Sequence, residues 1–413
     1  MNELKKLEQE VLEEGREWTR RRLEERLQEA ARNVDSVCPQ SGRRLKKTRW
    51  RPMSLKTVVG ELKIQVEHGY SPKSRTWHCP ARRAWALDKY QRVSPELEAR
   101  VSFTATEVGS YERAAKMAKC WGSEVSDDLI HQCVKRNALK AAELELPPEK
   151  PAACEPGFSM VIMMDGWMVR ERGQDWGASR RKRKAERIDW REIKSAVIFR
   201  LEQQVQTSGG RGLLLEKFVA ACPPLTDPVD YGKAVHAEAM RRGLGRAKKT
   251  YVVIDGAVVL WEVAEDRFHE AIKTLDFHHA SQHLWAVGHA LYGQGTQEAK
   301  NWVEPLRHKL RHGKELRVVR TLEDLVKQKK GKPAVRKTIR KETNYFQKHR
   351  DHIHYQKRSK EGSPIGSGAV ESLCGQLQKR FKVGGQFWRR PGLTHLLRIC
   401  VLFRNKDDKY LWN

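Results

Sequence analysis

The chain has 413 residues, with 80 Lys and Arg against 52 Asp and Glu, which gives a formal net charge of +28 at pH 7. This excess is too large to be explained by solubility alone, and it indicates a polyanionic partner, most simply nucleic acid. The alternative is a basic protein associated with ribosomes or with a membrane surface. The chain contains no long apolar segment and no signal peptide, so we expect a soluble intracellular protein of two or three domains that does not enter a membrane.

The first region, residues 1–36, is charged and helix-prone. Its apolar residues form an irregular stripe of helical period, which suits pairing with a second copy, crossing DNA or packing on its own domain. The second region, residues 37–93, is predicted to be a small β-rich module. Within it, Lys56–His68 alternates apolar and polar residues around Gly60, as a hairpin does.

Zinc is not expected in the β-rich module. Cys38 and Cys79 each begin a sequence like a zinc knuckle, but Ser41 and Arg82 stand where the second cysteine of each knuckle would be. Two thiolates do not complete a four-ligand structural zinc site. Since the 8 cysteines form no CxxC pair, we expect reduced thiols in a cytosolic chain.

Residues 94–146 are predicted to be helical. Ser110–Lys119 has a helical pattern, Gly122 breaks it, and Ser126 is a good N-cap for the next helix. This pair of helices has the spacing of a helix-turn-helix that recognises DNA, although many helical pairs share that spacing. The segment Pro147–Gly157 is the clearest linker in the chain.

Residues 158–283 change to a pattern of strands. We predict strands at Ser159–Met164, Ile193–Leu201, Leu213–Cys222, Tyr251–Ile254 and within Ala271–Phe277, and a helix at Asp230–Arg242. This order is that of an RNase H-like fold, a mixed sheet flanked by helices in which the first and fourth strands are neighbours. The basic run Arg180–Lys184 between the first two strands is either a solvated loop or a phosphate contact.

Two of these predicted strands end in a carboxylate followed by glycine, at Asp165 and Asp255. A buried strand holds the backbone of its last residue firmly, while the loop beyond leaves room for a metal ion and a substrate. We therefore expect both carboxylates at one edge of the sheet, unless they only cap turns or pair with nearby Lys and Arg. We also expect a basic helical insertion at residues 284–357 and, at residues 358–413, helices that complete the core, one of which carries Glu371.

The motifs along the chain resemble those of a known family. In order, they are Asp165-Gly166, Asp255-Gly256, Asp276-Phe-His-His279 and Gly366-Ser-Gly-Ala-Val-Glu371, followed by Lys379-Arg380 and Gly384-x-x-x-Trp388. The series is similar to that of the DDE transposases of bacterial insertion sequences, specifically the Kra-type group. The resemblance runs from about Cys38 to near the end of the chain.

The resemblance implies an enzyme that cuts and rejoins DNA with Asp165, Asp255 and Glu371 as catalytic carboxylates. Such a site holds two Mg²⁺ or Mn²⁺ ions about 3.5–4 Å apart, one activating the attacking oxygen and one stabilising the leaving oxygen. Carboxylate oxygens suit these ions, whereas the histidines of the chain complete no zinc site. Asp276 and His279 resemble an accessory signature that orients the metal site or the cleaved strand.

Six residues on and after the last catalytic helix are candidate DNA contacts: Lys379, Arg380, Lys382, Trp388, Arg389 and Arg390. The cations would meet phosphates, while Trp388 either stacks on an unpaired base or lies in the core. The resemblance implies that double-stranded DNA is the partner, as terminal inverted repeats and as target. It also implies a homodimer or larger assembly at the nucleoid, in the bacterial cytoplasm. The alternative is a domesticated or inactive copy that only binds DNA.

Overall fold

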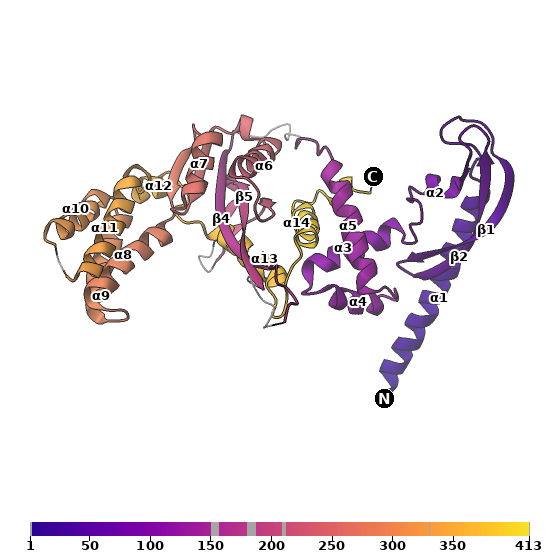
Figure 1. Cartoon of the computed structure of the whole chain (residues 1–413), viewed down its shortest axis with the longest axis horizontal. Coiled ribbons are helices and arrows are strands. Elements are labelled where there is room, and N and C mark those ends of the chain that lie inside the picture. Colours follow the sequence, from indigo (N-terminus) through magenta and orange to yellow (C-terminus); the bar gives the residue numbers. More distant parts are fainter. Residues whose placement is uncertain (1, 150–156, 180–186, 209–211, 330, 413) are drawn as a thin grey trace. The chain divides into compact units, whose positions relative to one another are not determined.

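The computed structural model describes residues 2–412 except 150–156, 180–186, 209–211 and 330 (Figure 1). The basic run Arg180–Lys184 and most of the linker thus lie outside the described residues. The chain divides into two compact units, Met1–Glu143 with Lys409–Asn413, and Leu144–Asp408. None of the described helices combines the length and the apolar character that crossing a membrane requires.

The first unit begins with a helix and a three-stranded sheet. Strands β1 (Lys46–Thr57), β2 (Gly60–Ser71) and β3 (Thr76–His78) pair antiparallel in that order. The tight β1–β2 turn is possible because Gly60 adopts a φ of 111°, which favours glycine. The long helix α1 (Glu3–Arg32) lies on β2 and buries Ala31 among apolar side chains of the two long strands.

The rest of the first unit is helical. The short helix α2 (Pro80–Ala84) precedes α3 (Pro95–Glu107), α4 (Tyr111–Cys120) and α5 (Asp127–Glu143), and the last three pack on one another. The hydroxyl of Ser126 accepts the N–H of Leu129 at 3.2 Å and so caps α5.

The second unit contains a five-stranded mixed sheet, with strand order β10-β9-β4-β5-β8. Its strands are β4 (Ser159–Arg172), β5 (Ile188–Arg200), β8 (Phe218–Cys222), β9 (Lys249–Ile254) and β10 (Ile272–Leu275). Strands β4, β9 and β10 are parallel neighbours, whereas β5 runs antiparallel to both β4 and β8. The expected mixed sheet is therefore present, with the first and fourth of its strands adjacent.

Two predicted strands differ most from the structure, while β5 and β9 begin five and two residues earlier than predicted. Strand β4 continues past Met164 to Arg172, because residues 165–172 pair in unbroken register with β5 and bury Trp167 and Val169. The predicted strand Leu213–Cys222 is divided. Its first residues belong to β7 (Gly212–Leu214), which forms a separate hairpin with β6 (Gln204–Gln206), and only β8 joins the main sheet.

Helices cover both faces of this sheet (Figure 1). Helices α6 (Pro228–Arg241) and α7 (Val258–Arg267) cover one face of the sheet. There they share a hydrophobic core with Met160, Ile162 and Met164 of β4. Helices α13 (Gly368–Phe381) and α14 (Arg390–Arg404) contact β4, β5 and β8 and bury further apolar side chains, such as Leu373 and Leu396. Every strand is thus covered, which agrees with the continuous apolar runs in the sequence.

A helical cluster interrupts the core between β10 and α13. Its helices are α8 (Phe277–Tyr292), α9 (Gln297–Arg311), α10 (Glu315–Lys327), α11 (Pro333–Lys348) and α12 (Tyr355–Lys360). Helix α8 starts directly after β10 and packs on α9 and α11, while α10 also packs on α9 and α11. One continuous helix therefore joins the sheet to the inserted cluster.

Candidate active site

Three aspartates stand side by side where parallel strands β4, β9 and β10 are neighbours. Met164 of β4 and Leu275 of β10 are both paired with Ile254 of β9. The next residue along each strand is an aspartate, namely Asp165, Asp255 and Asp276. Because neighbouring strands lie about 4.8 Å apart, this register forms a row of three carboxylates. The structure thus brings Asp165 and Asp255 together, and it adds Asp276 as a third member.

Asp165 is a partly buried carboxylate in an acidic environment. Its Oδ1 accepts the N–H of Gly166 at 2.7 Å. Burial raises the pKa of Asp165 to about 6; the Gly166 N–H and His279 oppose this rise, and the charges of Asp255 and Glu371 add to it. Burial raises the pKa of the Cys374 thiol on α13, and the neighbouring charge of Asp165 adds to the rise. A nearby cation would relieve the repulsion among these carboxylates.

Replacing Asp165 with Asn should remove a pH dependence of stability in the ion-free protein. The folded-state pKa near 6 exceeds the ordinary value of 3.8, so between these values the folded chain holds more protons than the unfolded chain. The free energy of unfolding therefore falls as the pH rises from about 4 to about 6. We expect Asp165→Asn to lack this fall and to melt higher than the wild type at neutral pH. Thermal melts with chelator across this range test it; parallel profiles would refute it.

Asp255 follows the end of β9 at the start of a tight loop. Its Oδ1 accepts the N–H of Ala257 at 2.9 Å, and its main-chain oxygen accepts Nε1–H of Trp261 at 2.7 Å. These two hydrogen bonds hold the Asp255 carboxylate next to the N-terminus of α7. Its second oxygen, Oδ2, remains available as a ligand atom, because no hydrogen bond to it is found among the described residues.

Asp276 connects the end of β10 to the loop before α13, the helix that carries Glu371. The side chain is fully buried and caps α8, its Oδ1 accepting the N–H of His279 at 2.6 Å. Its Oδ2 accepts both the N–H and the hydroxyl of Ser367, at 2.6 and 2.9 Å. The Ser367 hydroxyl also lies 2.7 Å from Oε1 of Glu371, one turn into α13. Asp276 therefore orients the turn from which Glu371 projects.

The described residues contain one group of three side chains able to hold a metal ion together. Ligand atoms of Asp276, His279 and Glu371 all lie within 4.8 Å of one another. The trio predicted from sequence, Asp165, Asp255 and Glu371, does not form such a group. The Glu371 carboxylate nevertheless lies close enough to Asp165 to raise the pKa of that residue. The four acids and His279 thus form one continuous cluster.

Tyr345 of the inserted helix α11 reaches into this cluster. A Cβ built on Gly256 would lie 2.7 Å from Cζ of Tyr345 and closer still to Cε2 and Oη. The Tyr345 ring stacks on His283 with centroids 3.6 Å apart, and His283 in turn pairs with Glu342. Burial raises the pKa of Tyr345, with the charges of Asp255 and Asp276 adding to the rise, so its phenol stays protonated. Gly256 is therefore needed because any side chain there would meet this ring.

The six predicted DNA contacts divide into exposed and internal residues. Lys379, Lys382 and Arg389 are exposed. Arg380 and Trp388 are only 3% and 7% exposed, and Nε1–H of Trp388 donates to the main-chain oxygen of Phe381 at 2.8 Å. Of the two alternatives for Trp388, the structure therefore favours the core residue, and it also buries Arg380, which was expected to meet a phosphate. Both are core residues, because residues 382–388 fold back along the end of β4.

Arg390 is also engaged within the protein. Its guanidinium donates to both carboxylate oxygens of the buried Glu171, at 3.2 and 2.6 Å. A bidentate pair of this kind is geometrically specific, so Arg390 joins the start of α14 to β4. Among the predicted contacts, Lys379, Lys382 and Arg389 remain exposed, and the ammonium of Lys382 lies over the ring of Trp190, 5.1 Å from its centroid.

The sequence interpretation missed three residues of the cluster. Ser367 lies inside the Gly366–Glu371 motif, and Cys374 follows Glu371 by three positions, so helical spacing could have pointed to both. Tyr345 lies far from every motif, and its position depends on how α11 packs against α8.

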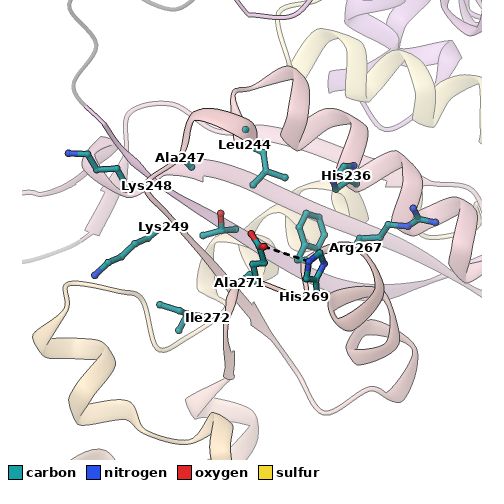
Figure 2. Close-up of a pocket in the computed structure, with 13 residues that line it drawn as sticks. His236, Leu244, Ala247, Lys248, Lys249, Arg267, His269, Ala271 and Ile272 are labelled. Atoms are coloured by element: carbon teal, nitrogen blue, oxygen red, sulfur yellow. Dashed lines mark ion pairs between the residues drawn. The ribbon is translucent and has the colours of Figure 1, made fainter.

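A separate cavity of about 430 Å³ lies at the opposite ends of the same strands (Figure 2). Lys249 and Ile272 line it at the amino ends of β9 and β10, and His236 and Phe268 also line it. The aspartates follow the carboxyl ends of these strands, so this cavity is not part of the acidic cluster. Ligands of parallel sheets also bind at carboxyl ends, which favours the acidic cluster as the functional site.

Comparisons with known proteins give little further identification. No protein-family model matches the chain, and no curated protein was found to match it. Among solved structures, it is similar to a "Drosophila P element transposase strand transfer complex", with a TM-score of 0.35 and 10% identity. That match covers 76% of this chain and 93% of the other. A likeness this distant does not establish a shared function.

Proposed function

We propose that the chain is a DNA transposase of the DDE type, built on an RNase H-like core. One observation carries the proposal, the row of Asp165, Asp255 and Asp276 at neighbouring parallel strands, with Glu371 joined to it through Ser367. The motif series that resembles the Kra-type transposases supports it, as does the strand order with the first and fourth strands adjacent. The net charge of +28 agrees with a DNA substrate.

The donor set fits divalent metal ions that prefer oxygen. Asp165, Asp255 and Glu371 supply carboxylate oxygens, the ligands that Mg²⁺ and Mn²⁺ favour, while His279 offers a nitrogen. The raised pKa of Asp165 reflects negative charge that such ions would neutralise. When bound, the ions would supply Lewis-acid activation of a phosphodiester and its attacking oxygen. We assign these three carboxylates as the ligands and Asp276 as the residue that orients Glu371.

The reaction itself needs no external energy source. In cleavage, a water oxygen attacks the phosphorus, the bond to the 3′ oxygen breaks, and that oxygen leaves as a 3′-hydroxyl with a proton from water. In joining, the 3′-hydroxyl attacks a target phosphodiester, whose own 3′ oxygen leaves, so one ester replaces another. The protein contributes position and electrostatic stabilisation, which are the main sources of rate in phosphoryl transfer.

Incubation with DNA that carries the terminal repeats flanking the gene tests the proposal. We expect nicks at the repeat ends that appear with Mg²⁺ or Mn²⁺ and vanish with chelator, followed by joined products when target DNA is added. Binding of the same DNA without cleavage at any ion concentration would instead support the alternative, a transposase-derived protein that only binds DNA. Two ends must be brought together, so we also propose a dimer or larger assembly during joining.

A further inference from the structure

The outer face of α11 forms a cationic groove that the acidic cluster does not explain. The groove has a volume of about 670 Å³ and is lined by Lys329, Arg336, Lys337, Arg340, Lys341 and Asn344. All six side chains are exposed. The residues on α11 recur every three or four positions and so share one face of the helix. The opposite face is buried through side chains such as Ile339 and Phe346.

The positive charge of this groove is not neutralised by the protein. Lys341 forms an ion pair with Glu342 at 3.5 Å. Within the part of the chain that the structure describes, Lys329, Arg336, Lys337 and Arg340 form no ion pair with an acid. A groove lined by charges of one sign concentrates positive potential, so it favours an anionic ligand.

The dimensions and side chains of the groove fit a nucleic-acid backbone. From Pro333 to Asn344, α11 extends about 16 Å, which corresponds to about five base-pair steps of a duplex. None of the lining residues is aromatic. Single-stranded DNA is commonly held by stacking its bases on aromatic side chains, so their absence from the lining favours a duplex held by its phosphates.

The same helix leads to the acidic cluster. Tyr345 directly follows Asn344 of the groove, and its ring packs over Gly256, beside Asp255. We propose that the cationic groove of α11 binds the phosphate backbone of double-stranded DNA that extends from the acidic cluster. The inference rests on the proposed function, since DNA is the substrate named there. Beyond that function, it assigns a second DNA-binding surface, on the inserted helices and outside the cleavage site.

Salt-dependent binding of the full chain to a duplex of about 30 base pairs tests the groove. The test variant changes Arg336, Lys337, Arg340 and Lys341 to Gln. The matched control changes Lys300, Lys314, Arg317 and Arg320 to Gln, which are exposed cations of α9 and α10 and the turn between them that do not line the groove. Both variants lose the same net charge, so a difference in DNA affinity between them shows that the location of the cations matters.

We expect the groove variant to reduce the magnitude of the slope of log K against log salt by about 3.6, because each of the four lost phosphate contacts contributes about 0.9. At about 100 mM salt its affinity should fall at least about tenfold, while the control changes by less than about threefold. Equal losses in the two variants would overturn the inference, and so would a loss seen only with single-stranded DNA. If the wild type itself binds no DNA, the proposed function fails as well.

Discussion

Asp255→Asn should lower ion-dependent cleavage of terminal-repeat DNA by about 10³-fold, because a metal ligand supports several kcal/mol of transition-state charge and each ~1.4 kcal/mol is tenfold. Asparagine has the same shape, and its Oδ1 can still accept the N–H of Ala257 that Asp255 accepts now. The fold and the affinity for DNA should therefore change little. Single-turnover cleavage and anisotropy binding, measured on the same preparation, separate the two effects.

The matched control is Asp266→Asn, an exposed aspartate on α7 that pairs with its neighbour Arg267 at 2.9 Å. It should cleave like the wild type. Asp165→Asn and Glu371→Gln should resemble Asp255→Asn. Cleavage by the Asp255 variant within about tenfold of the wild-type rate would remove this carboxylate from the catalytic set.

Asp276→Asn should lower stability as well as cleavage, unlike Asp255→Asn, because both oxygens of this buried carboxylate accept protein hydrogen bonds. An amide there would turn one acceptor into a donor that faces the N–H of His279 or the N–H and hydroxyl of Ser367. Hydrogen bonds to a charged group contribute about 1.5–3 kcal/mol, so stability should fall along with cleavage. A loss of cleavage with unchanged melting would instead place Asp276 among the metal ligands.

Gly256→Ala should both destabilise the second unit and impair cleavage. Its Cβ would lie 2.7 Å from Cζ of Tyr345, on a ring already stacked against His283. Overpacking of this kind costs about 1–3 kcal/mol, and any shift of the loop also displaces Asp255, so cleavage should fall further than stability alone explains. Denaturant unfolding and cleavage rates measure the two effects.

A double-mutant cycle with Tyr345→Ala tests whether that ring is the cause. Once the ring is removed, Gly256→Ala should cost almost nothing, which gives a coupling energy of about 1–3 kcal/mol. Gly375→Ala is the control, because nothing lies within 4 Å of its Cβ position on α13. Alanine is the better helix former, so that change should be neutral or stabilising. If the losses of stability from Gly256→Ala and Tyr345→Ala were simply additive, a contact other than the Tyr345 ring would be the reason for the glycine.

Local pattern predicted the parts of the site that lie on strands. Apolar runs ending at Asp165 and Asp255 marked buried neighbouring strands, and alternation around Gly60 marked the first hairpin. Local pattern did not predict the length of β4, because residues 165–172 are held by pairing with a distant strand. Nor did it separate Leu213, which is half exposed in a small hairpin, from the buried strand that follows.

The sequence by itself determined that three acidic motifs and a glutamate-bearing helix occur in one order, and that the chain is strongly basic. Only the tertiary structure decided that Asp276 holds Ser367, that Trp388 is internal and that Tyr345 covers Gly256. The reason is physical. Strand and helix periodicity depend on neighbouring residues, whereas these contacts join segments about a hundred residues or more apart, or depend on how an inserted helix packs.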